Sequence, residues 1–155
     1  YRRFTIYDED GQEIIRMVAT FVLMDRDSRK VHPVEPEIVA PYQSEFSKKL
    51  IRGPKYTELE EAISKDYHVR FYDLDMNGHV NNSKYLDWIF EVMGAEFLTN
   101  HIPKKINLKY VKEVRPGGMI TSSYELNQLE SNHQVTSDGD INAQAKITWQ
   151  KINKD

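Results

Sequence analysis

A strict alternation of apolar and polar residues near the C-terminus limits the fold more than any other feature. The apolar positions are Ile141, Ala143, Ala145, Ile147 and Trp149. A period of two is typical of a β-strand that buries one face. The two alanines are informative, because a sheet that wraps closely around a helix needs small side chains where the helix passes. The pattern therefore predicts an antiparallel sheet packed on a helix.

A helical pattern lies upstream of this strand. Apolar residues recur there at spacings of three and four, at Tyr85, Trp88, Ile89, Val92, Met93 and Phe97. Asn82 or Ser83 is the expected N-cap. Further strands are predicted at Tyr67–Tyr72, Ile106–Val114, Met119–Leu129 and Ile141–Ile152, with turns at Gly117-Gly118 and at Ser137–Asp140. A strand, a polar loop, a long helix and then three or four antiparallel strands make an α+β fold.

The first part of the chain predicts a hairpin. Its strands are expected at Phe4–Tyr7 and Ile14–Met24, joined at Asp10-Gly11, where both residues would supply positive φ angles. Such a hairpin has little core, so residues 1–30 must pack on something else, and an exposed edge would favour a homodimer. The chain starts in a strand-like pattern at Tyr1, which suggests a piece of something longer. Four prolines from Pro33 to Pro54, together with weak periodicity, predict a linker with at most short helices at Val34–Lys65.

Composition excludes several kinds of site. The 155 residues contain no cysteine, so no disulfide, thiolate nucleophile or cysteine metal site is possible. The net charge of -3 argues against general nucleic-acid binding. The apolar stretches are too short to span a membrane and the first residues lack the apolar core of a signal peptide, so we expect a cytoplasmic protein without membrane contact.

One segment is basic although the chain as a whole is acidic. Its cations are Lys104, Lys105, Lys109, Lys112 and Arg115, against a single acid, Glu113. An ordinary solvated strand face would explain these residues. A docking surface for an acidic partner would explain them as well.

The densest group of reactive side chains is the polar loop at 71–82, just before the predicted helix. Four of its residues match the first positions of an EF-hand calcium loop: Asp73, Asp75, Asn77 and Gly78. The match fails at the last position, where Lys84 replaces the bidentate glutamate, and a strand precedes the loop in place of a helix. A zinc or iron site would use His79, but no second histidine stands at a ligand spacing. Asp73, Asp75 and Asn77 could also simply cap turns in a loop that enters a helix.

The same loop suits acyl transfer. It ends at a helix N-terminus, whose free N–H groups and dipole favour an oxygen that gains negative charge. Asn77 can donate or accept a hydrogen bond, and His79 can titrate near neutral pH or hold a water molecule. Since the chain has neither cysteine nor a G-x-S-x-G motif, direct attack by an activated water is the economical mechanism, and a carboxylate base would complete the site.

Asp73–Trp88 resembles the D-x-N-x-H-V-N-N-x-x-Y segment of the acyl-acyl-carrier-protein (acyl-ACP) thioesterases. Lys109–Val114 resembles the strand after the central helix, where relatives read roughly Y-x-x-E. Tyr7–Glu13 and Ala19–Asp25 resemble the last two strands of the first of two hot-dog domains in that family. A shorter form of the loop motif also occurs in acyl-CoA thioesterases, so it is more diagnostic of the hot-dog fold than of the substrate.

The resemblance implies both a site and a layout. Asp75, Asn77, His79 and Glu113 match the family's catalytic residues. Glu113 is then the general base for water, Asn77 and His79 position water and the thioester carbonyl, and Asp75 orients its neighbours. Many plant relatives have cysteine after the glutamate, whereas this chain has Val114, so only the glutamate-water route is open. No metal or organic cofactor is implied.

The implied layout is the end of a first hot-dog domain at 1–33, a linker at 34–65 and a second, catalytic hot-dog domain at 66–155. The implied function is hydrolysis of medium- or long-chain fatty acyl-ACP during fatty acid biosynthesis, with the acidic carrier protein docking on the basic segment. An acyl-CoA thioesterase and a non-catalytic acyl-thioester-binding module stay open as alternatives.

Overall fold

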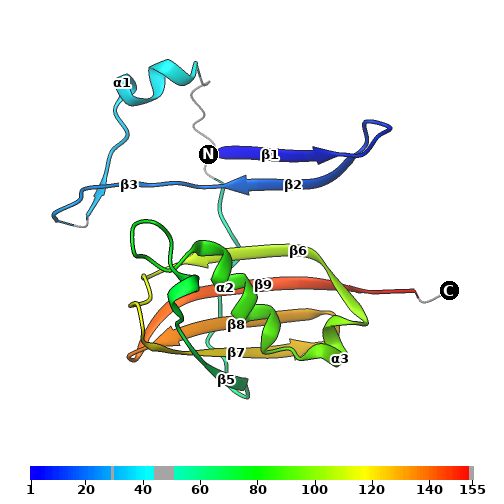
Figure 1. Cartoon of the computed structure of the whole chain (residues 1–155). Helices are drawn as coiled ribbons and strands as arrows, with labels where there is room; N and C mark the ends of the chain where they lie inside the picture. Colours follow the sequence, from blue (N-terminus) through cyan, green and yellow to red (C-terminus); the bar gives the residue numbers. More distant parts are fainter. Residues whose placement is uncertain (29, 44–50, 154–155) are drawn as a thin grey trace. The chain divides into compact units, whose positions relative to one another are not determined.

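The computed structural model of the chain describes residues 1–28, 30–43 and 51–153. It divides into two compact units, Tyr1–Leu50 and Ile51–Asp155 (Figure 1). None of the described helices is long and apolar enough to cross a membrane.

The second unit is one antiparallel sheet with a helix on one face (Figure 1). The strand order is β5-β7-β8-β9-β6. The strands are β5 (Ile63–His68), β6 (His101–Tyr110), β7 (Met119–Asn127), β8 (Glu130–Ser137) and β9 (Asp140–Lys151). The helices are η2 (Phe71–Asp73), α2 (Asn82–Glu91) and α3 (Ala95–Leu98). The predicted α+β fold is confirmed.

The core lies between α2 and the inner face of the sheet. The predicted alternation on β9 is confirmed from Ala143 to Trp149, where Ala143, Ala145 and Ile147 are fully buried, but not at Asn142, which is buried as well. Tyr85, Trp88 and Ile89 of α2 pack against them in the same cluster. The buried Ser122 hydroxyl on β7 donates a hydrogen bond of 3.0 Å to the Trp88 carbonyl, which ties the helix to the sheet.

The central helix differs from its prediction at both ends. Asn81 is the N-cap, in place of Asn82 or Ser83, because its side-chain oxygen accepts the Ser83 N–H at 3.0 Å. The helix ends at Glu91, and Gly94 then turns the chain with a φ of 81°. Phe97 therefore belongs to the separate turn α3.

Two strand predictions were wrong in their bounds. The first strand was expected at Tyr67–Tyr72, but β5 is already paired at Ile63, since an edge strand can form from polar residues when its neighbour supplies the hydrogen bonds. The next was expected at Ile106–Val114, but β6 starts at His101. Pro103 is tolerated there because β6 is an edge strand whose register shifts beside it.

Strand β8 was not predicted. Its inner face carries Ser131 and His133 beside Val135, and these buried polar residues hide the alternation that marked β9. Its turn to β9 uses positive φ at Asp138 and Gly139, which confirms the predicted turn.

The segment before β5 connects the sheet to the preceding chain. The Glu125 carboxylate on β7 accepts the main-chain N–H of Glu60 and, at 2.7 Å, that of Glu61. The predicted linker at 34–65 also contains the short helices α1 (Pro36–Val39) and η1 (Ala40–Tyr42), and the start of β5. Its residues 44–50 lie outside the described residues. The domain bounds stay a prediction.

The first unit is a hairpin of β1 (Arg2–Tyr7) and β2 (Glu13–Ala19), followed by the short pair β3 (Leu23–Met24) and β4 (Val31–His32). The predicted hairpin is confirmed, but its second strand ends at Ala19, and Leu23–Met24 pair instead with β4. Of the two predicted turn residues, only Gly11 has a positive φ, of 75°. The φ of Asp10 is not positive, and its N–H donates to the Asp8 carboxylate at 3.1 Å. No described residue of this unit is buried, so the described part has no core of its own.

Candidate active site

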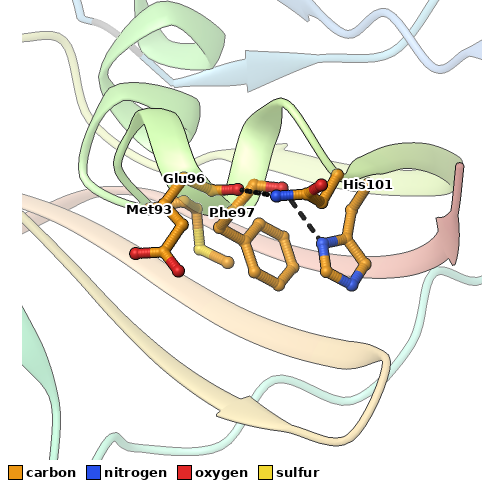
Figure 2. Close-up of a pocket in the computed structure, with 5 residues that line it drawn as sticks. Met93, Glu96, Phe97 and His101 are labelled. Atoms are coloured by element: carbon orange, nitrogen blue, oxygen red, sulfur yellow. Dashed lines mark hydrogen bonds between the residues drawn. The ribbon is translucent and has the colours of Figure 1, made fainter. Parts of the chain in front are cut away.

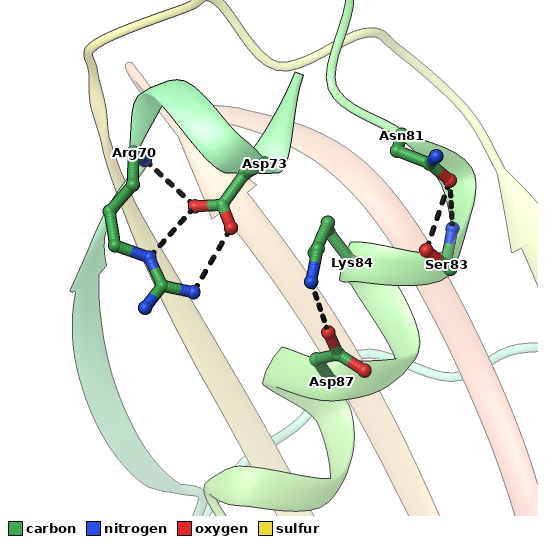
Figure 3. A network of polar contacts seen from close by, with 6 residues as sticks. All are labelled: Arg70, Asp73, Asn81, Ser83, Lys84 and Asp87. Atoms are coloured by element: carbon green, nitrogen blue, oxygen red, sulfur yellow. Dashed lines mark hydrogen bonds and ion pairs between the residues drawn. The ribbon is translucent and has the colours of Figure 1, made fainter. Parts of the chain in front are cut away.

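The polar loop before α2 is closed by Asp73. This side chain is fully buried, and its carboxylate accepts the Arg70 main-chain N–H at 2.7 Å and the Arg70 Nη2 at 3.0 Å (Figure 3). Burial alone would raise the pKa of Asp73, but the hydrogen bonds and charge of Arg70 lower it. The Asp73 carbonyl accepts the Asn81 N–H at 2.8 Å. Asp73 therefore joins the two ends of the loop.

Asp75 organises the tip of the loop. Its Oδ1 accepts the main-chain N–H groups of Asn77 at 2.8 Å and His79 at 3.0 Å. These bonds, with that from His79 the larger influence, lower the pKa of Asp75. Gly78 completes the turn with a φ of 76°. The interpretation that acidic residues cap turns here is thus right for Asp73 and Asp75, while Asn77 and His79 are left exposed on the tip.

Glu113 lies in the irregular segment that follows β6. It was predicted to lie in a strand, but the ladder stops at Tyr110 because the Asn142 carbonyl accepts the N–H groups of both Val111 and Lys112, at 2.8 and 3.2 Å. The chain then turns away from the sheet, and the Glu113 side chain is exposed while Val114 is buried.

Two contacts bind this segment to the start of α2. The Tyr110 hydroxyl donates to the Asn82 carbonyl at 2.9 Å, and the Val114 N–H donates to the Tyr85 hydroxyl at 3.2 Å. Burial raises the pKa of the Tyr85 hydroxyl, and the negative charge of Glu113 raises it as well. The hydrogen bond from the Val114 N–H lowers this pKa, but not enough to cancel the effect of burial. The segment that carries Glu113 therefore contacts the N-terminal part of α2, the helix that the polar loop enters.

The structure thus groups the four predicted residues around one helix N-terminus. Asp75, Asn77 and His79 share the loop that precedes α2, and the segment after β6 that carries Glu113 contacts the start of this helix. Figure 1 shows the end of β6 and the loop before α2 at the same end of the sheet. Sequence reasoning missed Asn142, which the alternation assigns to the outer face of β9. It is buried because the register of β8 and β9 shifts between Val135 and Thr136.

The predicted basic segment does not form one face. Lys105 and Lys109 are exposed, and they stand opposite Thr148 and Gln144 on the outer side of the edge strand β6. Lys112 forms an ion pair with Asp140.

A separate pocket lies at the far end of α2. It has a volume of about 280 Å³ and is lined by Met93, Glu96, Phe97, Asn100 and His101 (Figure 2). The rings of Phe97 and His101 stack with centroids 4.1 Å apart. None of the four predicted site residues lines this pocket.

Among the residues that the structure describes, no group of three or more His, Asp or Glu side chains is placed to hold a metal ion. Lys84, at the last position of the calcium-loop match, forms an ion pair of 2.9 Å with Asp87 (Figure 3).

An antiparallel sheet wrapped around a central helix, with a polar loop leading into that helix, defines the hot-dog fold. Residues 56–151 match the family model of the acyl-ACP thioesterase C-terminal domain, and residues 1–42 match that of the N-terminal domain. The chain belongs to the acyl-ACP thioesterase family.

Similar proteins include curated plant enzymes and a solved bacterial structure. The chain is 29% identical over 141 residues to oleoyl-acyl carrier protein thioesterase 2, chloroplastic, of Arabidopsis thaliana, covering 82% of this chain and 37% of that protein. It is 26% identical over 146 residues to a chloroplastic palmitoyl-acyl carrier protein thioesterase of Gossypium hirsutum, covering 88% and 35%. A crystal structure named as an oleoyl thioesterase from Lactobacillus plantarum has a TM-score of 0.83 at 30% identity, over 98% of this chain and 63% of that one.

The chain spans less than two fifths of these curated relatives, at 37% and 35% of their lengths.

Proposed function

We propose that the protein carrying this chain hydrolyses fatty acyl-ACP to a free fatty acid and the carrier protein, in fatty acid biosynthesis. The observation that carries the proposal is the grouping of the Asp75-organised loop and Glu113 around the start of α2. Membership of the family supports the reaction class. The names of the plant relatives support the carrier protein as the thioester donor.

The proposed reaction is a direct hydrolysis. Glu113 removes a proton from water, the water oxygen attacks the thioester carbonyl, and Asn77 and His79 hold the water and the carbonyl oxygen. The C–S bond then breaks, and the departing thiolate takes up a proton. Asp75 does not need to touch the substrate, since its two hydrogen bonds already fix the main chain of Asn77 and His79.

The proposed docking surface for the carrier protein is narrower than the basic segment as a whole. Lys105 and Lys109 project from the outer side of an edge strand, and Lys104 and Arg115 are exposed nearby in the sequence. Lys112 contributes less, because Asp140 already neutralises it. Acidic partners are steered by such opposite charge.

Two other functions are tested by the same experiment. Thiol release is measured from a long-chain acyl carrier protein and from the matching acyl-CoA, with the full-length protein and with Glu113→Gln. Turnover that prefers the carrier protein and falls about 100-fold or more in Glu113→Gln is expected. A preference for acyl-CoA would favour an acyl-CoA thioesterase. Tight binding without turnover of either donor would leave an acyl-thioester-binding module.

The cytoplasmic location and the homodimer both stay predictions. Fractionation of cells tests the first. Light scattering tests the second, and a monomer with a stable thermal transition would count against it.

A further inference from the structure

The peptide group between Glu113 and Val114 is held on both sides by buried side chains. Its carbonyl oxygen, that of Glu113, accepts a hydrogen bond from Asn142 Nδ2 at 3.3 Å. Its N–H, that of Val114, donates to the Tyr85 hydroxyl at 3.2 Å. Asn142 is 1% exposed and Tyr85 is 3% exposed, so neither contact competes freely with water.

Asn142 makes four hydrogen bonds to the segment 111–113, through its main-chain carbonyl and its side-chain Nδ2. Its carbonyl accepts the N–H groups of Val111 and Lys112, and its Nδ2 also donates to the Lys112 carbonyl at 3.3 Å. Its Oδ1 accepts the Ser137 hydroxyl at 2.9 Å, which fixes the orientation of the amide. One buried residue of β9 therefore shapes the main chain from 111 to 113.

Tyr85 holds the other side of the peptide from α2. Its ring packs edge-on against Trp88 and Tyr110, with centroids 5.5 and 5.2 Å away. Burial and the nearby charge of Glu113 raise the pKa of this phenol, so it stays protonated at neutral pH. The hydroxyl can thus accept the Val114 N–H and keep its own proton for a second hydrogen bond.

We propose that Asn142 and Tyr85 are positioning residues for Glu113, a role that rests on the proposed function of that glutamate as the base. Glu113 lies outside the sheet ladder, so strand pairing does not fix it. A general base must stay within hydrogen-bond reach of the water that it activates, and a displacement of 1 Å can cost about 100-fold in rate. The hydrogen bonds from Asn142 on β9 and Tyr85 on α2 form a clamp on its peptide group, which restrains the main chain at Glu113.

The test is a double-mutant cycle in the full-length protein. Asn142→Ala and Tyr85→Phe are each made in the native background and in Glu113→Gln, and kcat and KM are measured with acyl carrier protein. Each single variant is expected to lower kcat about 10- to 100-fold with little change in KM. In Glu113→Gln neither substitution should lower kcat further, because the group that it positions is gone.

Ser122→Ala is the matched control. It also removes a buried hydrogen bond between α2 and the sheet, to the Trp88 carbonyl, but this bond does not involve the Glu113 segment. It should leave kcat unchanged per folded molecule in both backgrounds. A second readout needs no turnover: hydrogen exchange at the Val114 amide should speed up about fivefold or more in Tyr85→Phe and stay unchanged in Ser122→Ala.

Failure of the clamp and failure of the proposed function give different results. Turnover that Glu113→Gln does not lower would overturn the base, and with it the positioning role. If turnover depends on Glu113, but Asn142→Ala and Tyr85→Phe lower kcat by the same factor in both backgrounds, the two residues are structural only. Unchanged exchange at Val114 in Tyr85→Phe would also overturn the clamp.

Discussion

The Asp75 carboxylate accepts the main-chain N–H of His79 at 3.0 Å, and the Asp75 N–H donates back to the His79 carbonyl at 2.7 Å. These two hydrogen bonds between Asp75 and His79 close the tip of the loop, which consists of the residues between them. The exposed His79 ring therefore projects from a fixed main chain. The N–H donors of His79 and Asn77 also keep the pKa of Asp75 low, so the acceptor is a charged carboxylate at neutral pH.

Asp75→Ala should lower kcat about 10- to 100-fold, since the main chain at Asn77 and His79 loses its common acceptor. Asp75→Asn keeps a side-chain oxygen and should retain more activity. The pKa of Asp75 is below 3.8, so its stabilising effect is present above that pH and is lost as the pH falls through the lower folded value. Kinetics at pH 7 with both variants tests the loop, and equal activity of Asp75→Ala and the native protein would contradict it.

Asp73→Asn should destabilise the protein more than Asp87→Asn. Both acids pair with a cation three residues away, at 3.0 Å for Arg70–Asp73 and 2.9 Å for Lys84–Asp87. The Asp73 carboxylate is fully buried, although its partner Arg70 is 70% exposed, whereas the Asp87 side chain is itself 61% exposed. A buried carboxylate loses more when its pairing is removed than an exposed one does. We expect a loss of about 1–3 kcal/mol for Asp73→Asn and under about 0.5 kcal/mol for Asp87→Asn.

Urea denaturation of the two variants measures this difference in the free energy of unfolding. Similar losses would show that burial of Asp73 does not strengthen its pairing with Arg70.

The sequence predicted most of the sheet and its packing helix because their signals are local. The alternation on β9 and the helical spacing from Tyr85 to Ile89 come from burial of one face, which any sequence displays directly. β8 was missed because the buried Ser131 and His133 are polar residues that hydrogen-bond to each other, and partners in space cannot be seen in a linear pattern.

The candidate site also has some residues that the sequence predicted and one that it did not. Asp75, Asn77 and His79 lie close together in the sequence, so they can be recognised as a motif. Glu113 lies far from them in the sequence and was found only through the family resemblance. Asn142 could not be found by either route, since a register shift buries it against the rule of alternation. Its role depends on a segment that is distant in sequence and adjacent in space.

We expect the protein to lose stability under mildly acidic conditions because of His133. This histidine is buried, with its Nε2 2.7 Å from the Ser131 hydroxyl, and burial lowers its pKa from 6.5 to about 4. Because the pKa of His133 is lower in the folded protein than in the unfolded chain, the unfolded chain binds a proton at a higher pH. Protonation of the unfolded chain then lowers the free energy of unfolding. The loss should therefore begin as the pH falls below 6.5 and reach about 3 kcal/mol near pH 4.

His133→Gln removes this titration while keeping a polar side chain at the position. Its free energy of unfolding, measured by urea between pH 7 and pH 4.5, should fall less steeply than that of the native protein. Parallel curves would show that His133 does not cause the acid sensitivity.

Removing Lys105 and Lys109 should weaken productive encounters with acyl carrier protein. Both side chains are exposed on the outer side of β6, and an acidic partner would be steered toward them. The double variant with alanine at both positions should lower kcat/KM for acyl carrier protein about 3- to 10-fold at low salt, and the difference should shrink at high salt because exposed charges are screened. Lys65→Ala is the control, since β5 is the opposite edge of the sheet and Lys65 is also exposed. An equal loss in Lys65→Ala would mean that overall charge, and not a surface on β6, governs the encounter.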